Sequence, residues 1–164
     1  MNARFELRGR HGVIVSPVAP VDRTGGKVLS DDKIIRDILV NSKTIALVGA
    51  SPRPHRASHQ VMGYLLAKGY RVIPVNPNEA GSTIHGQAVR ASLSEIDEPI
   101  DLVDIFRNSV GAGDAVDDAI EAQAKAVWMQ LGVINEPAAE RAAESGMAVV
   151  MDRCPALEIP RLGL

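Results

Sequence analysis

The residues best suited to bind a ligand lie in a loop between an apolar run and a helical pattern. The apolar run, residues 44–48, ends at Gly49, and the polar loop that follows carries Arg53 and Arg56. The pattern over residues 57–68 then predicts a helix. In an open parallel sheet, such a turn brings together free backbone N–H groups and the positive end of a helix dipole. Because arginine matches phosphate geometry with paired donors, the loop predicts a phosphate-binding site.

Other side chains that could take part in chemistry are isolated in the sequence. Cys154 is the only cysteine, and Arg153 beside it is expected to lower the pKa of the thiol, although a quiet, partly buried cysteine is the alternative. His55 and His59 have the i, i+4 spacing of a helical metal pair, but no third ligand follows them, so we expect no metal site. Asp104 interrupts an apolar run, where we expect a hydrogen-bonded structural role.

The elements that must position these residues alternate between strands and helices. Apolar runs predict strands at residues 44–48, 71–76, 100–106, 126–131 and 148–151, with a minor strand near 83–85. Amphipathic patterns predict helices that begin at Ser30 and span residues 57–68, 109–124 and 136–145, with a single turn at 92–96. This alternation predicts an α/β fold of three layers around a doubly wound, mainly parallel sheet.

Composition indicates one domain with an aliphatic core. The chain has 164 residues, of which 46% are apolar and only 3% aromatic. The net charge of −2 does not favour nucleic acid as a partner. We also expect no membrane span, because no apolar stretch approaches about 18–20 residues. A single cysteine and the lack of a signal-peptide core are typical of a cytoplasmic protein.

The first 28 residues differ from the rest of the chain. They are basic near the start and then rich in proline, glycine and small polar residues. We interpret residues 1–28 as an arm that is mobile or laid along the surface and that carries no strand. Residues 29–164 then form the domain.

The phosphate loop lacks the common nucleotide fingerprints. A G-x-G-x-x-G turn is absent, and no acidic residue ends the second predicted strand, where Asn76 and Pro77 stand and Glu79 comes late. Ordinary binding of a nicotinamide dinucleotide is therefore less favoured, though it stays open. A Walker A loop is absent too. The arginines instead indicate a ligand with several phosphates.

Five separated segments resemble the small stand-alone CoA-binding domain proteins. These segments occur in order and are residues 45–52, 70–77, 103–108, 128–135 and 151–160. The resemblance covers about residues 30–164, and the family is similar in fold to the CoA-binding domain of succinyl-CoA synthetase. It implies a Rossmann-like domain that holds coenzyme A across the C-terminal edge of the sheet.

The resemblance implies roles for residues of the first turn. Gly49 would let the backbone approach the pyrophosphate, and Ser51 would donate a hydrogen bond from its hydroxyl. Arg53, Arg56 and Ser58 would surround the phosphates.

Later strand ends would complete the site that the resemblance implies. Asn76 and Pro77 would line the adenosine side after the second strand. Phe106 and Arg107 would cover the adenine or a phosphate after the next main strand. Gln130 would close the following strand end.

These observations lead to one leading hypothesis and two alternatives. The leading hypothesis is non-catalytic binding of coenzyme A or an acyl-CoA, with no catalytic residue and no metal. One alternative is a subunit of an acyl-CoA ligase-type enzyme, which would need a partner subunit because this chain has no room for the ATP-binding and phosphohistidine modules. The other is a redox-sensing or regulatory module that binds a nicotinamide dinucleotide. Under oxidising conditions, we further expect Cys154 to form a mixed disulfide with coenzyme A.

Overall fold

A mostly parallel sheet forms the centre of the computed structural model, which describes residues 14–15 and 31–164. Its strands are β1 (Ile14–Val15), β2 (Thr44–Val48), β3 (Arg71–Val75), β6 (Leu102–Ile105), β7 (Ala126–Met129) and β8 (Ala148–Val150). They lie in the order β1-β8-β7-β6-β2-β3, and all neighbours are parallel except β1 and β8.

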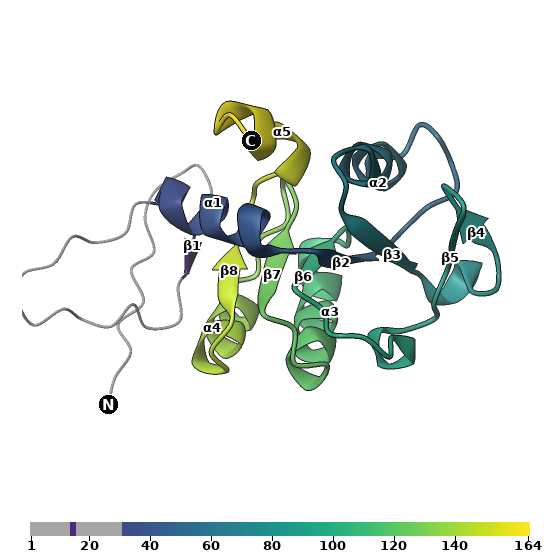
Figure 1. The fold of residues 1–164 in the computed structure, drawn as a ribbon. Coiled ribbons are helices and arrows are strands. Elements are labelled where there is room, and N and C mark those ends of the chain that lie inside the picture. Colours follow the sequence, from purple (N-terminus) through teal and green to yellow (C-terminus); the bar gives the residue numbers. More distant parts are fainter. Residues whose placement is uncertain (1–13, 16–30) are drawn as a thin grey trace, which may run out of the picture.

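Helices cover both faces of this sheet, as Figure 1 shows. One face carries α1 (Asp31–Asn41), α2 (Ala57–Ala67) and α5 (Pro155–Arg161), and the other carries α3 (Ser109–Glu121) and α4 (Glu136–Glu144). The predicted three-layer, Rossmann-like α/β fold is therefore confirmed.

Alternation along each strand divides the core into two layers. On β7, Trp128 packs toward α1, α2 and α5, whereas Val127 and Met129 pack toward α3 and α4. All three side chains are fully buried, as expected for parallel strands covered on both faces. The indole Nε1 of Trp128 donates a 2.7 Å hydrogen bond to the carbonyl oxygen of Arg153.

The strand order reverses beside β2. The chain passes from β2 outward to β3 and then returns to β6, which pairs with the other side of β2. The loops after β2 and β6 consequently lead to helices on opposite faces of the sheet, α2 and α3. In open α/β sheets, this switch point is where ligands bind.

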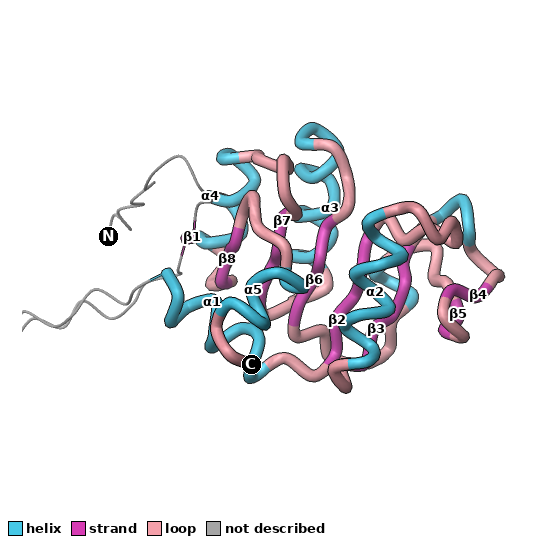
Figure 2. The backbone as a smooth tube through the Cα atoms, turned by 90° about the horizontal axis from the view of Figure 1, so that it is seen from above, coloured by secondary structure: helices cyan, strands magenta, loops and turns pink. Residues whose placement is uncertain are grey.

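A hairpin lies outside the main sheet. The predicted minor strand forms β4 (Thr83–Ile84), which pairs with β5 (Gln87–Ala88) in a separate two-stranded sheet. Figure 2 shows this hairpin beyond β3, away from the other strands. The predicted single turn forms the 3-10 helix η2 (Leu93–Glu95), and another short turn, η1 (Pro77–Glu79), follows β3.

Two elements differ from the sequence predictions. The arm was expected to carry no strand, but β1 within it pairs with β8, so this expectation is wrong at residues 14–15. Backbone pairing can recruit so short a segment without a pattern of its own. The second difference is α5, a helix that was not predicted because its sequence contains two prolines. Pro155 occupies the first turn, where proline is tolerated, and Pro160 lies near the end. Ser30, where a helix was predicted to begin, lies outside the described residues, as does the arm apart from residues 14–15.

Within the described ranges, no helix has the length and apolar character needed to cross a bilayer.

Candidate functional site

A cleft of about 560 Å³ lies at the carboxyl ends of the parallel strands, at the switch point beside β2. Most of the predicted site residues line it: Gly49, Ser51, Arg53, Arg56, Ser58, Asn76, Phe106, Arg107 and Gln130. Pro77 does not line the cleft and is exposed in η1. The structure therefore brings nine of the ten predicted residues together around one cavity.

Gly49 makes the turn at the end of β2 possible. Its φ is +85°, and a Cβ at this position would lie 2.1 Å from the carbonyl oxygen of Phe106. The backbone N–H of Gly49 donates to the carbonyl of Val75 at the end of β3. Only glycine satisfies both the left-handed backbone and this close approach. The turn therefore leaves room for a ligand without a side chain in the way.

The N-terminus of α2 opens into the cleft. Its N-cap residue, Arg56, makes no side-chain capping bond, and the amides of Ala57 and Ser58 have no partner among residues 31–164. These free donors and the helix dipole favour an anion. Arg53 and Arg56 are exposed beside them, and Arg107 reaches the cleft from the end of β6.

The serines of this region have different surroundings. The Oγ of Ser51 accepts a 3.2 Å hydrogen bond from the backbone N–H of Arg53, which shapes the loop. Ser58 is buried in the first turn of α2 and lines the cleft, and its hydroxyl bonds to no other group in residues 31–164. The Ser58 hydroxyl is therefore free to bond a ligand.

Asn76 links two loops rather than standing free. Its Nδ2 donates to the carbonyl of Ala50 at 2.8 Å, and its Oδ1 accepts from the backbone N–H of Asn78 at 2.9 Å. Through these bonds, Asn76 holds the turn after β2 against the end of β3. Glu79, which the sequence placed too late to be a ribose ligand, reaches the cleft because η1 folds back after β3.

A buried polar pair lies at the β6–β7 side of the cleft. Gln130, which lines the cleft and is 6% exposed, donates from Nε2 to Asp104 Oδ1 at 2.7 Å. Asp104 is fully buried, and its Oδ2 has no partner. Burial raises the pKa of Asp104 to about 7, whereas the bond from Gln130 acts in the opposite direction. Asp104 therefore has the hydrogen bond that its position in the strand predicts.

Cys154 forms part of the same end of the cleft. It is 7% exposed and precedes α5. Burial raises the pKa of its thiol, so the expectation that Arg153 would lower it is wrong. The reason is that the guanidinium of Arg153 is directed to Glu158, to which Nη1 donates at 3.2 Å.

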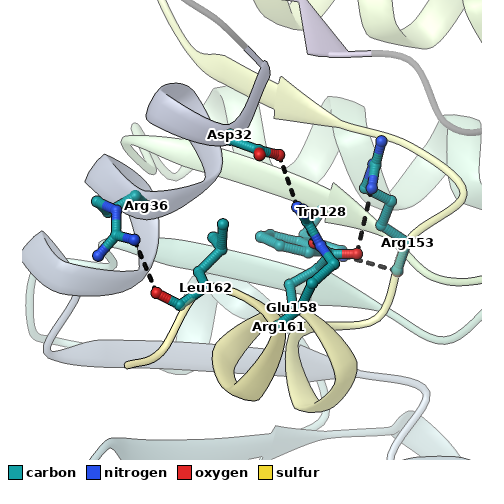
Figure 3. A network of polar contacts seen from close by, with 7 residues as sticks. All are labelled: Asp32, Arg36, Trp128, Arg153, Glu158, Arg161 and Leu162. Atoms are coloured by element: carbon teal, nitrogen blue, oxygen red, sulfur yellow. Dashed lines mark hydrogen bonds and ion pairs between the residues drawn. The ribbon is translucent and has the colours of Figure 1, made fainter.

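A network of charged groups holds the segment that carries Cys154 (Figure 3). The carboxylate of Glu158, 6% exposed, accepts from both Arg153 and Arg161. Arg161 also donates to Asp32 of α1 at 2.7 Å. Sequence reasoning missed this network, because a lone glutamate in a proline-bounded segment carries no sign that it is buried.

The two histidines with metal-pair spacing are not placed as one site. His59 packs instead against His85 of the β4–β5 turn, with ring centroids 4.0 Å apart. Among the residues that the structure describes, no group of three or more His, Cys, Asp or Glu side chains is placed to hold a metal ion.

Comparison with known proteins identifies the family. The family model described as CoA binding domain matches residues 43–160. The uncharacterized protein YneT of Bacillus subtilis (strain 168) is 42% identical over 120 residues, which are 73% of this chain and 87% of that protein. A hypothetical protein from Pyrococcus horikoshii OT3 has a similar structure, with a TM-score of 0.77 and 41% identity over 83% of this chain and 94% of its own.

A larger enzyme contains a similar unit. The dinucleotide-forming acetyl-coenzyme A synthetase 1 of Ca. Korarchaeum cryptofilum is 26% identical with a TM-score of 0.60, and the match covers 69% of this chain but 26% of the synthetase. The present chain therefore corresponds to about a quarter of that enzyme. By the match over residues 43–160 and its 42% identity to a relative, the chain belongs to the CoA binding domain family.

Proposed function

We propose that the protein binds coenzyme A or an acyl-CoA reversibly in this cleft, without catalysing a reaction. The observation that carries the proposal is the glycine turn at Gly49 beside the uncapped N-terminus of α2. Two free amides, the buried Ser58 hydroxyl and the arginines supply donors for a diphosphate. Membership of the CoA binding domain family supports the same ligand.

The polarity of the cleft matches the two halves of coenzyme A. Arg53 and Arg56 stand at the α2 end, where phosphates would be neutralised. Gln130, Leu131 and Val133 stand at the β7 end, which offers one amide among apolar groups. A pantetheine chain has this character, with amide groups between short apolar segments. We therefore place the phosphates at α2 and the pantetheine chain across β6 and β7, in a protein of the cytoplasm.

The ligand that co-purifies with the protein tests this proposal. After gentle purification, we would denature the protein and record the mass and absorbance spectrum of the released compound. We expect the released compound to have the mass of coenzyme A or an acyl-CoA. If the protein is purified without a ligand, we expect it to bind added coenzyme A. A nicotinamide dinucleotide in place of coenzyme A would contradict it.

A nicotinamide dinucleotide is the second candidate, because Glu79 lines the cleft. A carboxylate near the end of the second strand accepts hydrogen bonds from ribose hydroxyls, whereas it repels a phosphate on that ribose. The variant Glu79→Gln separates the two ligands. If the cleft is built for a dinucleotide, this change weakens NAD binding, whereas coenzyme A binding should stay the same or tighten.

A further inference from the structure

Polar groups from three separate elements meet at the β6–β7 side of the cleft, which Gln130 and Cys154 line and behind which Asp104 is buried. Asp104 is on β6, Gln130 follows β7, and Cys154 precedes α5. Asp104 alternates with Val103 and Ile105, which pack toward α3, so its side chain lies on the face of α2 and α5. Cys154 packs on that same face. Three groups with hydrogen-bonding or thiol chemistry thus meet beneath one end of the cleft.

Gln130 presents an acceptor to whatever occupies this end. The side chain is more than nine-tenths buried, and its Nε2 is held by Asp104. Its Oε1 bonds to no group in residues 31–164, although Gln130 lines the cleft. This oxygen opens to the cleft and is free to accept a hydrogen bond from an N–H donor of a ligand. A pantetheine amide supplies such a donor.

The strand order sets the direction in which the ligand extends. With its diphosphate at α2 and its adenosine toward β3, the other end of coenzyme A must cross β6 and β7, since these strands follow in the order β3-β2-β6-β7-β8. That path passes Gln130 and ends at the wall formed by Cys154. The sulfur of coenzyme A is at this end of the ligand.

We propose that Cys154 is a thiol-exchange site, which takes up coenzyme A as a mixed disulfide when coenzyme A disulfide is present. The inference rests on the proposed function. The Cys154 thiolate attacks one sulfur of the disulfide, a bond between Cys154 Sγ and that sulfur forms, and the original S–S bond breaks. The second coenzyme A leaves as a thiolate, and the proton of Cys154 passes to water. No other oxidant is consumed.

The Cys154 thiol is not activated by its surroundings. Its preference for coenzyme A disulfide over small disulfides must therefore come from binding in the cleft. Burial raises the pKa of the thiol and outweighs the backbone hydrogen bonds from Ala156 and Leu157, which lower it, while the charges of Asp104 and Glu158 add to the effect of burial. Little thiolate is present at neutral pH, so small disulfides in solution should react slowly. A disulfide held in the cleft keeps its sulfur beside Cys154 at a high effective concentration. Exchange should therefore favour ligands that the phosphate loop binds.

Intact-mass spectrometry of the folded protein tests this proposal, because Cys154 is the only cysteine and every adduct must be on it. The protein would be incubated with coenzyme A disulfide and, separately, with 2-hydroxyethyl disulfide. We expect the coenzyme A adduct to form at least roughly tenfold faster, to be removed by dithiothreitol, and to be absent from Cys154→Ser. Equal rates for the two disulfides would overturn the proposal.

A second variant tests whether the cleft guides the reaction. Arg53→Ala should lower the ratio of the coenzyme A disulfide rate to the 2-hydroxyethyl disulfide rate, because the arginine contacts only the ligand that carries phosphates. Calorimetry of the parent protein with coenzyme A under reducing conditions tests reversible binding separately from thiol exchange at Cys154. Reversible binding without an adduct on the folded protein overturns the exchange site alone. Absence of reversible binding overturns the proposed function and the inference together.

Discussion

Gly49 lies directly against the backbone of Phe106, so that a Cβ on Gly49 would stand 2.1 Å from the Phe106 carbonyl oxygen. This contact joins the ends of β2 and β6 at the point where the strand order reverses. Both residues line the cleft, so the approach of two backbones forms part of its wall.

The first prediction concerns this contact. A positive φ alone costs a residue with a side chain about 1–3 kcal/mol. Gly49→Ala should lower the free energy of unfolding by more than this, because the added Cβ also clashes with the Phe106 backbone. Gly69→Ala is the matched control, since Gly69 also has a positive φ but nothing lies within 4 Å of its added Cβ. Urea denaturation measures both variants. Equal losses would show that the clash relaxes without cost.

The second prediction concerns the loop arginines. Arg53→Ala and Arg56→Ala should each weaken coenzyme A binding by roughly 1–3 kcal/mol, because each removes a charge-assisted contact to phosphate. The loss should shrink at high salt. Arg71→Ala is the control, because it removes the same charge at the opposite edge of the sheet, where Arg71 pairs with Glu98. Titration calorimetry at two salt concentrations measures the effect. If all three variants bound like the parent, Arg53 and Arg56 would not contact the phosphates.

The third prediction concerns the pH dependence that Asp104 creates. Burial raises its pKa from 3.8 to about 7, so between these values the folded state holds a proton that the unfolded state releases. Its contribution therefore lowers the free energy of unfolding as pH rises through this window, by a few kcal/mol at about 1.4 kcal/mol per pKa unit. Asp104→Asn removes this titration and keeps an acceptor for Gln130.

The measurement is urea denaturation of parent and Asp104→Asn from about pH 4.5 to 8. The difference between variant and parent isolates Asp104 from other carboxyl groups, and it should move in favour of the variant as pH rises. Parallel stability curves would show that the Asp104 carboxyl titrates alike in both states.

The fourth prediction concerns the network that holds the Cys154 segment. Glu158→Gln should destabilise the protein by roughly 2–4 kcal/mol, since it leaves Arg153 and Arg161 without their buried carboxylate. Asp32→Asn is the control from the same network, and it should cost less than about 1 kcal/mol because its pair with Arg161 is exposed. Fluorescence of Trp128, the only tryptophan, reports unfolding. Equal costs would mean that burial of Glu158 is unimportant.

Regular elements could be predicted from the sequence because their pattern is local. The aliphatic runs at β2, β3, β6, β7 and β8 are continuous, as expected of strands covered on both faces. Gly49 and the arginines of the next loop indicated the cleft for a similar reason, since a strand, a turn and a helix follow each other directly. In these regions, neighbours in sequence are neighbours in space.

What could not be predicted depends on distant contacts. Glu79 reaches the cleft only because η1 turns back after β3, and Glu158 is buried only because two arginines and α1 surround it. Arg153 suggested a lowered thiol pKa for Cys154 by adjacency, but its guanidinium is directed to Glu158 and burial raises the pKa. Adjacency in sequence predicts a charge effect only when the side chain points at its neighbour.

Calorimetric titration with coenzyme A, dephospho-coenzyme A and NAD, carried out under reducing conditions, tests the central claim most directly. The account predicts that coenzyme A binds most tightly, because three arginines line the cleft and the ligand carries an additional ribose phosphate for them to neutralise. Loss of that phosphate should weaken binding, and NAD should bind more weakly than coenzyme A. Tighter binding of NAD than of coenzyme A would contradict the account.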